Sequence, residues 1–121
     1  MKNKSVVVDA SYVLDLLLPD EKKSGAELLH AISPQLLVFE VTNAIKMAVV
    51  RKRITAKVAH ILINEFLGWR IKLLDVQPNA VLNLAMEKGL AVYDASYLWL
   101  ANEQKAELLT WDKKLKNAAS T

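Results

Sequence analysis

The chain has no cysteine among its 121 residues, and it has only three glycines and three prolines. The absence of cysteine excludes disulfide bonds and thiolate metal sites, and it fits a protein of the reducing cytosol. Because few glycines and prolines interrupt the chain, we expect a fold rich in helices. No apolar run reaches the roughly 20 residues that a membrane-spanning helix needs. We therefore expect a cytoplasmic protein with no membrane contact.

Composition is otherwise close to that of an ordinary single domain. We expect residues 1–121 to form one domain, since a chain of this length can bury its own core. The hydrophobic share of 53% is slightly high, which favours a buried interface between two copies of the chain. The net charge of +3 is too small to indicate nucleic-acid binding by itself. The positive charge is nevertheless clustered, and such clusters are either solvated helix faces or phosphate contacts. The clustered residues are Lys46, Arg51, Lys52 and Arg53 in one group and Lys113, Lys114 and Lys116 in another.

The tetrapeptide Asp-Ala-Ser-Tyr occurs twice, at residues 9–12 and 94–97, next to apolar residues in both places. A carboxylate in an apolar setting is costly to bury unless a cation meets it. Two such carboxylates, Asp9 and Asp94, suggest a shared site with a metal ion between them. The alternative is that each Asp-x-Ser is a helix N-cap, and one copy alone would not decide between the two.

Two more acids have similar settings: Glu40 follows Leu36-Leu37-Val38-Phe39, and Asp112 follows Leu108-Leu109-Thr110-Trp111. The apolar patterns predict strands alternating with helices, and hence a parallel sheet covered by helices. The expected strands are 5–8, 35–38, 70–76 and 107–111, and the expected helices are 11–18, 23–32, 39–52, 56–67, 78–88, 93–104 and 112–119. Sites in such folds form beyond the carboxyl ends of the strands. With the acids at strand ends or near helix starts, we expect all four at one edge.

Four carboxylates in one cleft repel one another, at a cost of roughly 4 kcal/mol for each pair 4 Å apart in an effective dielectric of about 20. Protonation or a cation must relieve that repulsion. Oxygen ligands without histidine or cysteine suit Mg²⁺ or Mn²⁺. A divalent metal activates water and stabilises a phosphoryl transition state, so we expect hydrolysis of phosphodiester bonds.

The chain resembles the PIN-domain nucleases, and among them the toxin half of bacterial and archaeal VapBC toxin–antitoxin pairs. The resemblance covers nearly the whole chain and depends on the order and spacing of four motifs. They are Val-Val-Val-Asp-Ala-Ser at 6–11, Phe-Glu-Val-Thr-Asn-Ala at 39–44, Tyr-Asp-Ala-Ser-Tyr-Leu at 93–98 and Leu-Thr-Trp-Asp-Lys-Lys-Leu at 109–115.

This resemblance implies a three-layer α/β/α sandwich around a short parallel sheet. It also implies a metal-dependent ribonuclease toxin held in check by a VapB-like antitoxin, with RNA as the substrate. The family's acidic positions match Asp9, Glu40, Asp94 and Asp112, which would bind Mg²⁺ or Mn²⁺. Supporting roles fall to Ser11, Asn43 and Thr110. Family members usually continue into a fifth, final edge strand, for which the chain leaves no room, so we expect that strand to be absent.

Two other functions remain open at this stage. One is a different Mg²⁺-dependent phosphoryl-transfer enzyme, although a covalent aspartyl mechanism usually needs Asp-x-Asp and position 11 is serine. The other is an inactive PIN-like module that only binds RNA or protein.

Further interpretations concern residues outside the four acids. Asp15 is a rival ligand near Asp9, but its place inside the first expected helix favours a solvated or paired side chain. Stacking on nucleic-acid bases is open to Trp69, Trp99 and Trp111, with core or dimer packing favoured for Trp99. We expect a homodimer, and a groove between the apolar stretches 41–50 and 58–67 that an antitoxin helix would fill.

Overall fold

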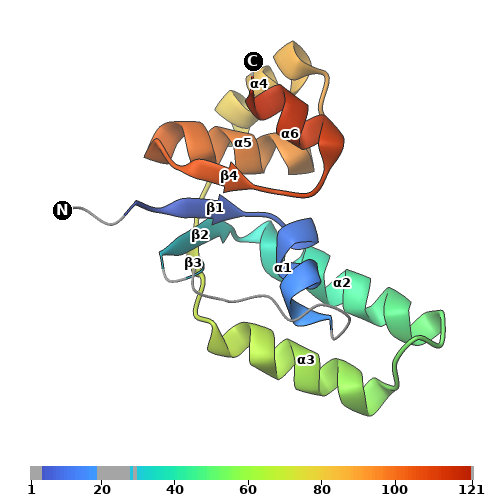
Figure 1. The fold of residues 1–121 in the computed structure, drawn as a ribbon. Coiled ribbons are helices and arrows are strands. Elements are labelled where there is room, and N and C mark those ends of the chain that lie inside the picture. The colour runs from blue at the N-terminus through green and yellow to red at the C-terminus, as the bar shows by residue number, and fades with distance from the viewer. Residues whose placement is uncertain (1–3, 19–27, 29, 121) are drawn as a thin grey trace.

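The computed structural model describes residues 4–18, 28 and 30–120 (Figure 1). Within these residues the strands are β1 (Val6–Val8), β2 (Ala31–Pro34), β3 (Lys72–Leu74) and β4 (Glu107–Leu109). The helices in the same residues are α1 (Ala10–Leu17), α2 (Leu36–Val50), α3 (Ala56–Gly68), α4 (Pro78–Lys88), α5 (Val92–Gln104) and α6 (Lys113–Ala119). None of these helices combines the length and apolar character that crossing a membrane requires.

The described strands form one parallel sheet in the order β3-β2-β1-β4. Figure 1 shows α4, α5 and α6 gathered on one side of the molecule and α1, α2 and α3 on the other, with the strands between them. This is the predicted α/β/α sandwich. The central strand β1 is buried, with Val7 and Val8 both fully inaccessible to solvent. An apolar strand of this kind is typical of a sheet that is covered on both faces.

Local sequence signals set several helix ends where they were expected. Helix α4 begins at Pro78, and Gly89 ends it in the left-handed conformation at φ 65°, which glycine adopts without strain. Helix α3 follows Thr55, whose side chain accepts a hydrogen bond from the backbone N–H of Val58. These signals are local, which explains why the sequence alone located them.

The strand predicted at residues 35–38 is wrong, because α2 already begins at Leu36. The strand lies just before it, at Ala31–Pro34, where it pairs with both β1 and β3. A short apolar run such as Leu36-Leu37-Val38 does not by itself distinguish a strand from a buried helical turn. The helical reading wins because Leu37, Val41 and Ile45 recur at intervals of four and bury one face of the helix.

The helix predicted at 23–32 falls largely outside the described residues. Its last two positions are wrong, because Ala31 and Ile32 belong to β2. The earlier start of α2 also corrects the setting of Glu40, which lies in the second turn of that helix rather than near its N-terminus. The helix macrodipole acts mainly within the first turn, so it contributes little at Glu40. The described residues contain no fifth strand.

Candidate active site

A pocket of about 300 Å³ opens beyond the carboxyl ends of β1 and β4. These neighbouring strands stay paired to their last residues, and the N–H of Asp9 donates to the carbonyl of Leu109 at 3.3 Å. All four predicted acids line the pocket, although they are far apart along the chain. Its wall comprises Asp9, Ala10, Ser11, Leu14, Glu40, Asn43, Ala44, Asp94, Tyr97 and Asp112.

Asp9 is the most buried of the four acids, with only 5% of its surface exposed. Its Oδ1 accepts hydrogen bonds from the Ser11 hydroxyl at 2.7 Å and from the Tyr12 backbone N–H at 3.0 Å. Its Oδ2 accepts a hydrogen bond from the Thr110 hydroxyl. These three donors compensate for the loss of water and fix the direction of the carboxylate.

The loop after β4 is tied to the loop after β1 through two hydroxyl groups. The Thr110 hydroxyl donates to Asp9 and accepts from the backbone N–H of Asp112 at 3.0 Å. The Ser11 hydroxyl accepts from the backbone N–H of Trp111 at 2.9 Å. Because residues about 100 positions apart are joined in this way, the hydroxyls hold two of the acids in a fixed relation. Thr110 therefore supports the site from behind, without lining the pocket.

Glu40 points toward α5, where the hydroxyl of Tyr97 donates to its Oε1 at 2.5 Å. Burial raises the pKa of the Glu40 carboxyl; the Tyr97 hydrogen bond lowers it, and the charges of Asp94 and Asp9 raise it further. Burial, followed by the hydrogen bond to Glu40, also raises the pKa of Tyr97. The phenol therefore keeps its proton at neutral pH and donates a hydrogen bond to Glu40.

Asp94 lies in the first turn of α5 and faces the same pocket. Burial is the largest cause that raises the pKa of its carboxyl, followed by the negative charges of Asp112 and Asp9, while Lys114 lowers it. After burial, the negative charges of neighbouring acids also raise the pKa of both Glu40 and Asp94. The pocket is therefore a concentrated negative site that attracts cations.

Two of the acids are helix N-caps and also line the pocket. Asp9 is the N-cap of α1, and Asp112 is the N-cap of α6, where it accepts the N–H of Leu115 at 3.0 Å. The N-cap of α5 is Ala91, so Asp94 is not a cap. The rival Asp15 does not line the pocket.

The donor set fits a hard divalent cation such as Mg²⁺ or Mn²⁺, because it offers carboxylate oxygens and no sulfur or imidazole. Among the described residues, no three acidic or histidine side chains are grouped as a complete set of metal ligands. Such a set is not required, since Mg²⁺ keeps several of its waters and is usually held by one or two carboxylates. The fit therefore depends on the type of donor and on the shared pocket.

Tyr97 is a polar residue of the pocket to which the sequence analysis assigned no role. It lies three positions after Asp94, so the two share one face of α5, and this spacing was the available signal. Its link to Glu40 was not visible, because the two residues are 57 positions apart. Asn43 lines the pocket as expected, one turn after Glu40 on α2.

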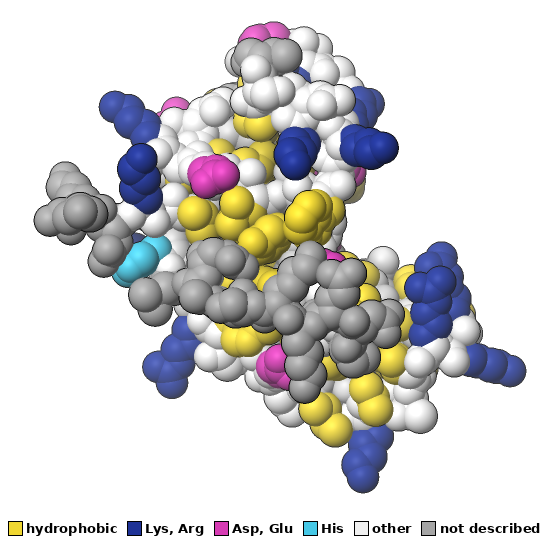
Figure 2. Space-filling view, in the orientation of Figure 1, with side chains coloured by type: hydrophobic (Ala, Val, Ile, Leu, Met, Phe, Trp, Pro, Cys, Tyr) yellow, Lys and Arg dark blue, Asp and Glu magenta, His cyan; other side chains and the backbone are white. Residues whose placement is uncertain are grey.

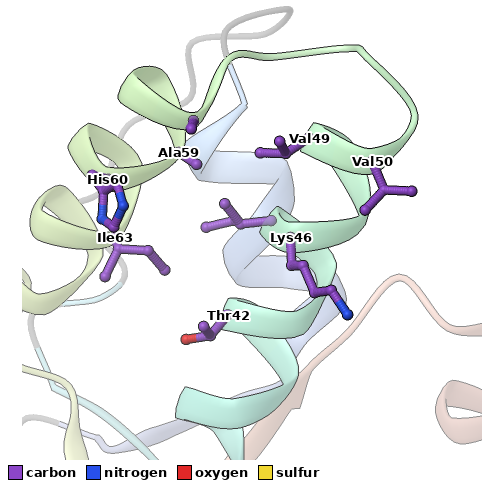
Figure 3. A pocket seen from close by; sticks show the side chains of 9 residues that line it. Thr42, Lys46, Val49, Val50, Ala59, His60 and Ile63 are labelled. Atoms are coloured by element: carbon purple, nitrogen blue, oxygen red, sulfur yellow. The ribbon is translucent and has the colours of Figure 1, made fainter.

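A second, apolar groove of about 260 Å³ lies between α2 and α3, where the sequence predicted one. Figure 3 shows Val49 on α2 and Ala59 on α3 pointing toward each other, with the amine of Lys46 pointing away. The groove is lined by Thr42, Ile45, Lys46, Val49, Val50, Ala56, Ala59, His60 and Ile63. It shares no residue with the acidic pocket, so the two are separate concave surfaces.

Known proteins are similar to this chain in sequence and in fold, although no family model matches it. Ribonuclease VapC3 from Pyrobaculum aerophilum is 32% identical over 123 aligned positions, which cover 91% of each chain. The crystal structure of PAE2754, also from Pyrobaculum aerophilum, superposes with a TM-score of 0.81 at 28% identity and covers 94% of this chain and 86% of its own. The similarity therefore extends over more than nine tenths of the chain in both comparisons. This chain belongs to the VapC family of PIN-domain proteins.

Proposed function

We propose that this protein is a Mg²⁺- or Mn²⁺-dependent endoribonuclease, and that it acts as the toxin of a toxin–antitoxin pair. The observation that carries the proposal is the single pocket in which Asp9, Glu40, Asp94 and Asp112 come together from four different elements. The name of the relative, Ribonuclease VapC3, supports RNA as the substrate. Oxygen donors alone, in a strongly negative pocket, support a hard divalent cation.

Each side chain has a part in this proposal. The four carboxylates would share in holding the cation in this pocket, and when bound the cation would supply positive charge to the phosphate and lower the pKa of the attacking water. Ser11 and Thr110 keep the Asp9 carboxylate in one orientation by donating to its two oxygens. The proposed catalytic metal ligands are Asp9, Glu40, Asp94 and Asp112. The residues that support them are Ser11, Asn43 and Thr110.

Metal dependence is the direct test of the reaction. Purified protein is expected to cleave RNA in Mg²⁺ or Mn²⁺ and to lose that cleavage in EDTA, because the cation would activate the water and stabilise the charge that develops on the phosphate. Labelled structured and single-stranded RNAs, resolved on gels, measure the rate. Cleavage that is equal in EDTA would contradict the proposal, as would turnover of a phosphomonoester without any cleavage of RNA.

Two apolar surfaces suggest two protein partners. The groove between α2 and α3 has an apolar lining that suits the apolar face of an amphipathic helix, which we assign to a VapB-like antitoxin. A separate set of exposed apolar side chains, Leu82 and Met86 on α4 and Val92 on α5, is assigned to a homodimer. Met86 is 66% exposed. Groups of exposed apolar side chains are uncommon on a protein surface unless another protein covers them.

A pair of variants separates these two surfaces. Ala59→Glu places a charge in the groove and is expected to abolish binding of the antitoxin encoded beside the gene, while the protein stays dimeric. Met86→Asp is expected to give a monomer at high micromolar concentration that still binds the antitoxin. Calorimetry measures binding, light scattering measures mass, and each variant is the control for the other. A wild-type monomer at high micromolar concentration would refute the dimer, and unchanged antitoxin binding by Ala59→Glu would refute the groove assignment.

A further inference from the structure

Trp111 is a large aromatic residue that the catalytic proposal leaves unused. It lies in the loop between β4 and α6, directly before the pocket residue Asp112, and 52% of its surface is exposed. Its neighbour Thr110 donates to Asp9, so the loop that carries the indole is part of the acidic site. The exposed ring is therefore held at the rim of the pocket.

The ring is fixed in place by contacts to α1. It stacks on Tyr12 with 5.9 Å between ring centroids and 15° between planes. The backbone N–H of Trp111 donates to the Ser11 hydroxyl at 2.9 Å, which anchors the residue at its main chain. A ring held in this way loses little side-chain freedom when a ligand binds to it, so binding is less costly.

Positively charged side chains lie on α6, the helix that follows this ring. The Nζ of Lys116 lies 5.8 Å from the centroid of the Trp111 ring, within range of a cation–π contact. Lys113 and Lys114 extend from the same short helix and are exposed. Figure 2 shows Lys and Arg side chains over the region of α6. An aromatic ring among lysines is the combination that binds single-stranded nucleic acid, in which the ring stacks on a base and the lysines contact phosphates.

We propose that Trp111, backed by Tyr12 and accompanied by Lys116, is a stacking platform for an unpaired base of the RNA substrate beside the acidic pocket. This proposal builds on the ribonuclease function proposed above, and it narrows the substrate to RNA that is single-stranded at the bound nucleotide. A base in a duplex already stacks on both sides and does not offer its face to a protein ring. When a base binds, Lys116 exchanges its contact with the indole for an ion pair with the adjacent phosphate.

A nucleic-acid base explains this surface better than a partner protein does. A partner's apolar side chain would gain from the indole but would gain nothing from the lysines of α6. The apolar groove, which suits a protein helix, is formed by α2 and α3 and shares no residue with this rim. The RNA backbone also needs positive contacts close to the pocket, because the four carboxylates repel its phosphates.

The test measures RNA binding without cleavage, so every protein carries Asp94→Asn and the buffer contains Mg²⁺. The probe is a labelled single-stranded RNA of about ten nucleotides, within the range of single-strand site sizes. Trp111→Ala is expected to weaken binding by about tenfold, and Trp111→Phe is expected to restore most of the affinity. Leu67→Ala, which also truncates an exposed apolar side chain on α3, is the matched control and should bind as the parent does.

Removal of single bases from the RNA provides a second measurement that does not depend on the fold of a variant. One abasic position is expected to weaken binding to the parent about tenfold, and the same abasic RNA should lose no further affinity with Trp111→Ala. This non-additivity is the signature of a direct contact. Binding of duplex RNA should be insensitive to Trp111→Ala.

Specific outcomes would overturn the platform. Equal binding by Trp111→Ala would do so, and so would abasic effects that persist unchanged in this variant. A loss confined to dimerisation or antitoxin binding would assign Trp111 to a protein contact and would also overturn the proposal. Since these assays contain no turnover, they are distinct from the ribonuclease test: absent cleavage with intact, Trp111-dependent binding would refute the enzyme and not the platform.

Discussion

Asp94→Asn is expected to lower the rate of RNA cleavage by roughly 10³-fold or more, because several kcal/mol of transition-state stabilisation depend on the cation that the carboxylates hold. Asp94 is a clean position for this change. It lines the pocket, and the N-cap of its helix is Ala91, so the substitution removes charge without removing a cap. Single-turnover cleavage in Mg²⁺ measures the effect on chemistry apart from product release.

The controls for this result use the same chemical change elsewhere. Glu65→Gln removes one negative charge from an exposed site on α3 and should leave cleavage unchanged. Asp112→Asn should be as inactive as Asp94→Asn, and it keeps the cap because asparagine is also a good N-cap. Full activity in Asp94→Asn would remove this residue from the catalytic set, and activity in all prepared variants would indicate a contaminating nuclease.

The meeting of the four acids in one pocket followed from the sequence because it depends on strand ends. Asp9 comes directly after β1, and Asp112 comes three residues after β4. In a parallel sheet, neighbouring strands end at the same edge, so their following residues meet. The repeated Asp-Ala-Ser-Tyr added Asp94, whose place in the first turn of α5 also agrees with expectation. Regular geometry therefore brings distant residues together without knowledge of their contacts.

The contacts inside the site did not follow from the sequence, because they join residues far apart in the chain. The hydrogen bond between Tyr97 and Glu40 and the stacking of Tyr12 on Trp111 depend on how α5, α2 and two loops pack. No local pattern encodes such pairs. Helix cap and site residue were treated as alternatives for Asp9, but they are not exclusive. Its carboxylate accepts hydrogen bonds from one helix N–H and from two hydroxyls. One carboxylate caps a helix and lines the pocket at once.

The error at residues 35–38 has a different origin. Leu36-Leu37-Val38 is apolar enough for either a buried strand or a helix, and the decision is made by partners on other elements. Ala31–Pro34 takes the place in the sheet between β1 and β3, which leaves the following residues to begin α2. Tertiary pairing overrides local preference here, and it moves Glu40 deeper into its helix than expected.

In EDTA, Asp94→Asn is expected to raise the melting temperature, because the Asp94 carboxylate is destabilising in the metal-free fold. Burial and then the charges of Asp112 and Asp9 raise its pKa, against the opposing effect of Lys114. The protonated Asp94 side chain therefore costs the fold no stability at a pH below the unfolded pKa of about 3.9. The stability of the wild-type fold then falls as the pH rises through the higher folded pKa and the side chain ionises. The advantage of the asparagine variant should therefore grow over this pH range and be complete at neutral pH.

Added Mg²⁺ is expected to reverse the order of the two proteins. A cation that binds only the folded state stabilises it by about 2.7 kcal/mol when its free concentration is 100 times its dissociation constant. Wild type should gain this stability, whereas Asp94→Asn, with one ligand charge fewer, should gain much less. Thermal melts of both proteins and of Glu65→Gln, in EDTA and along a Mg²⁺ titration, measure the effect. Glu65→Gln should follow wild type throughout, since its charge lies outside the pocket. An Asp94→Asn protein that melts below wild type in EDTA, together with equal Mg²⁺ shifts in all three, would show that the acids do not form one cation site.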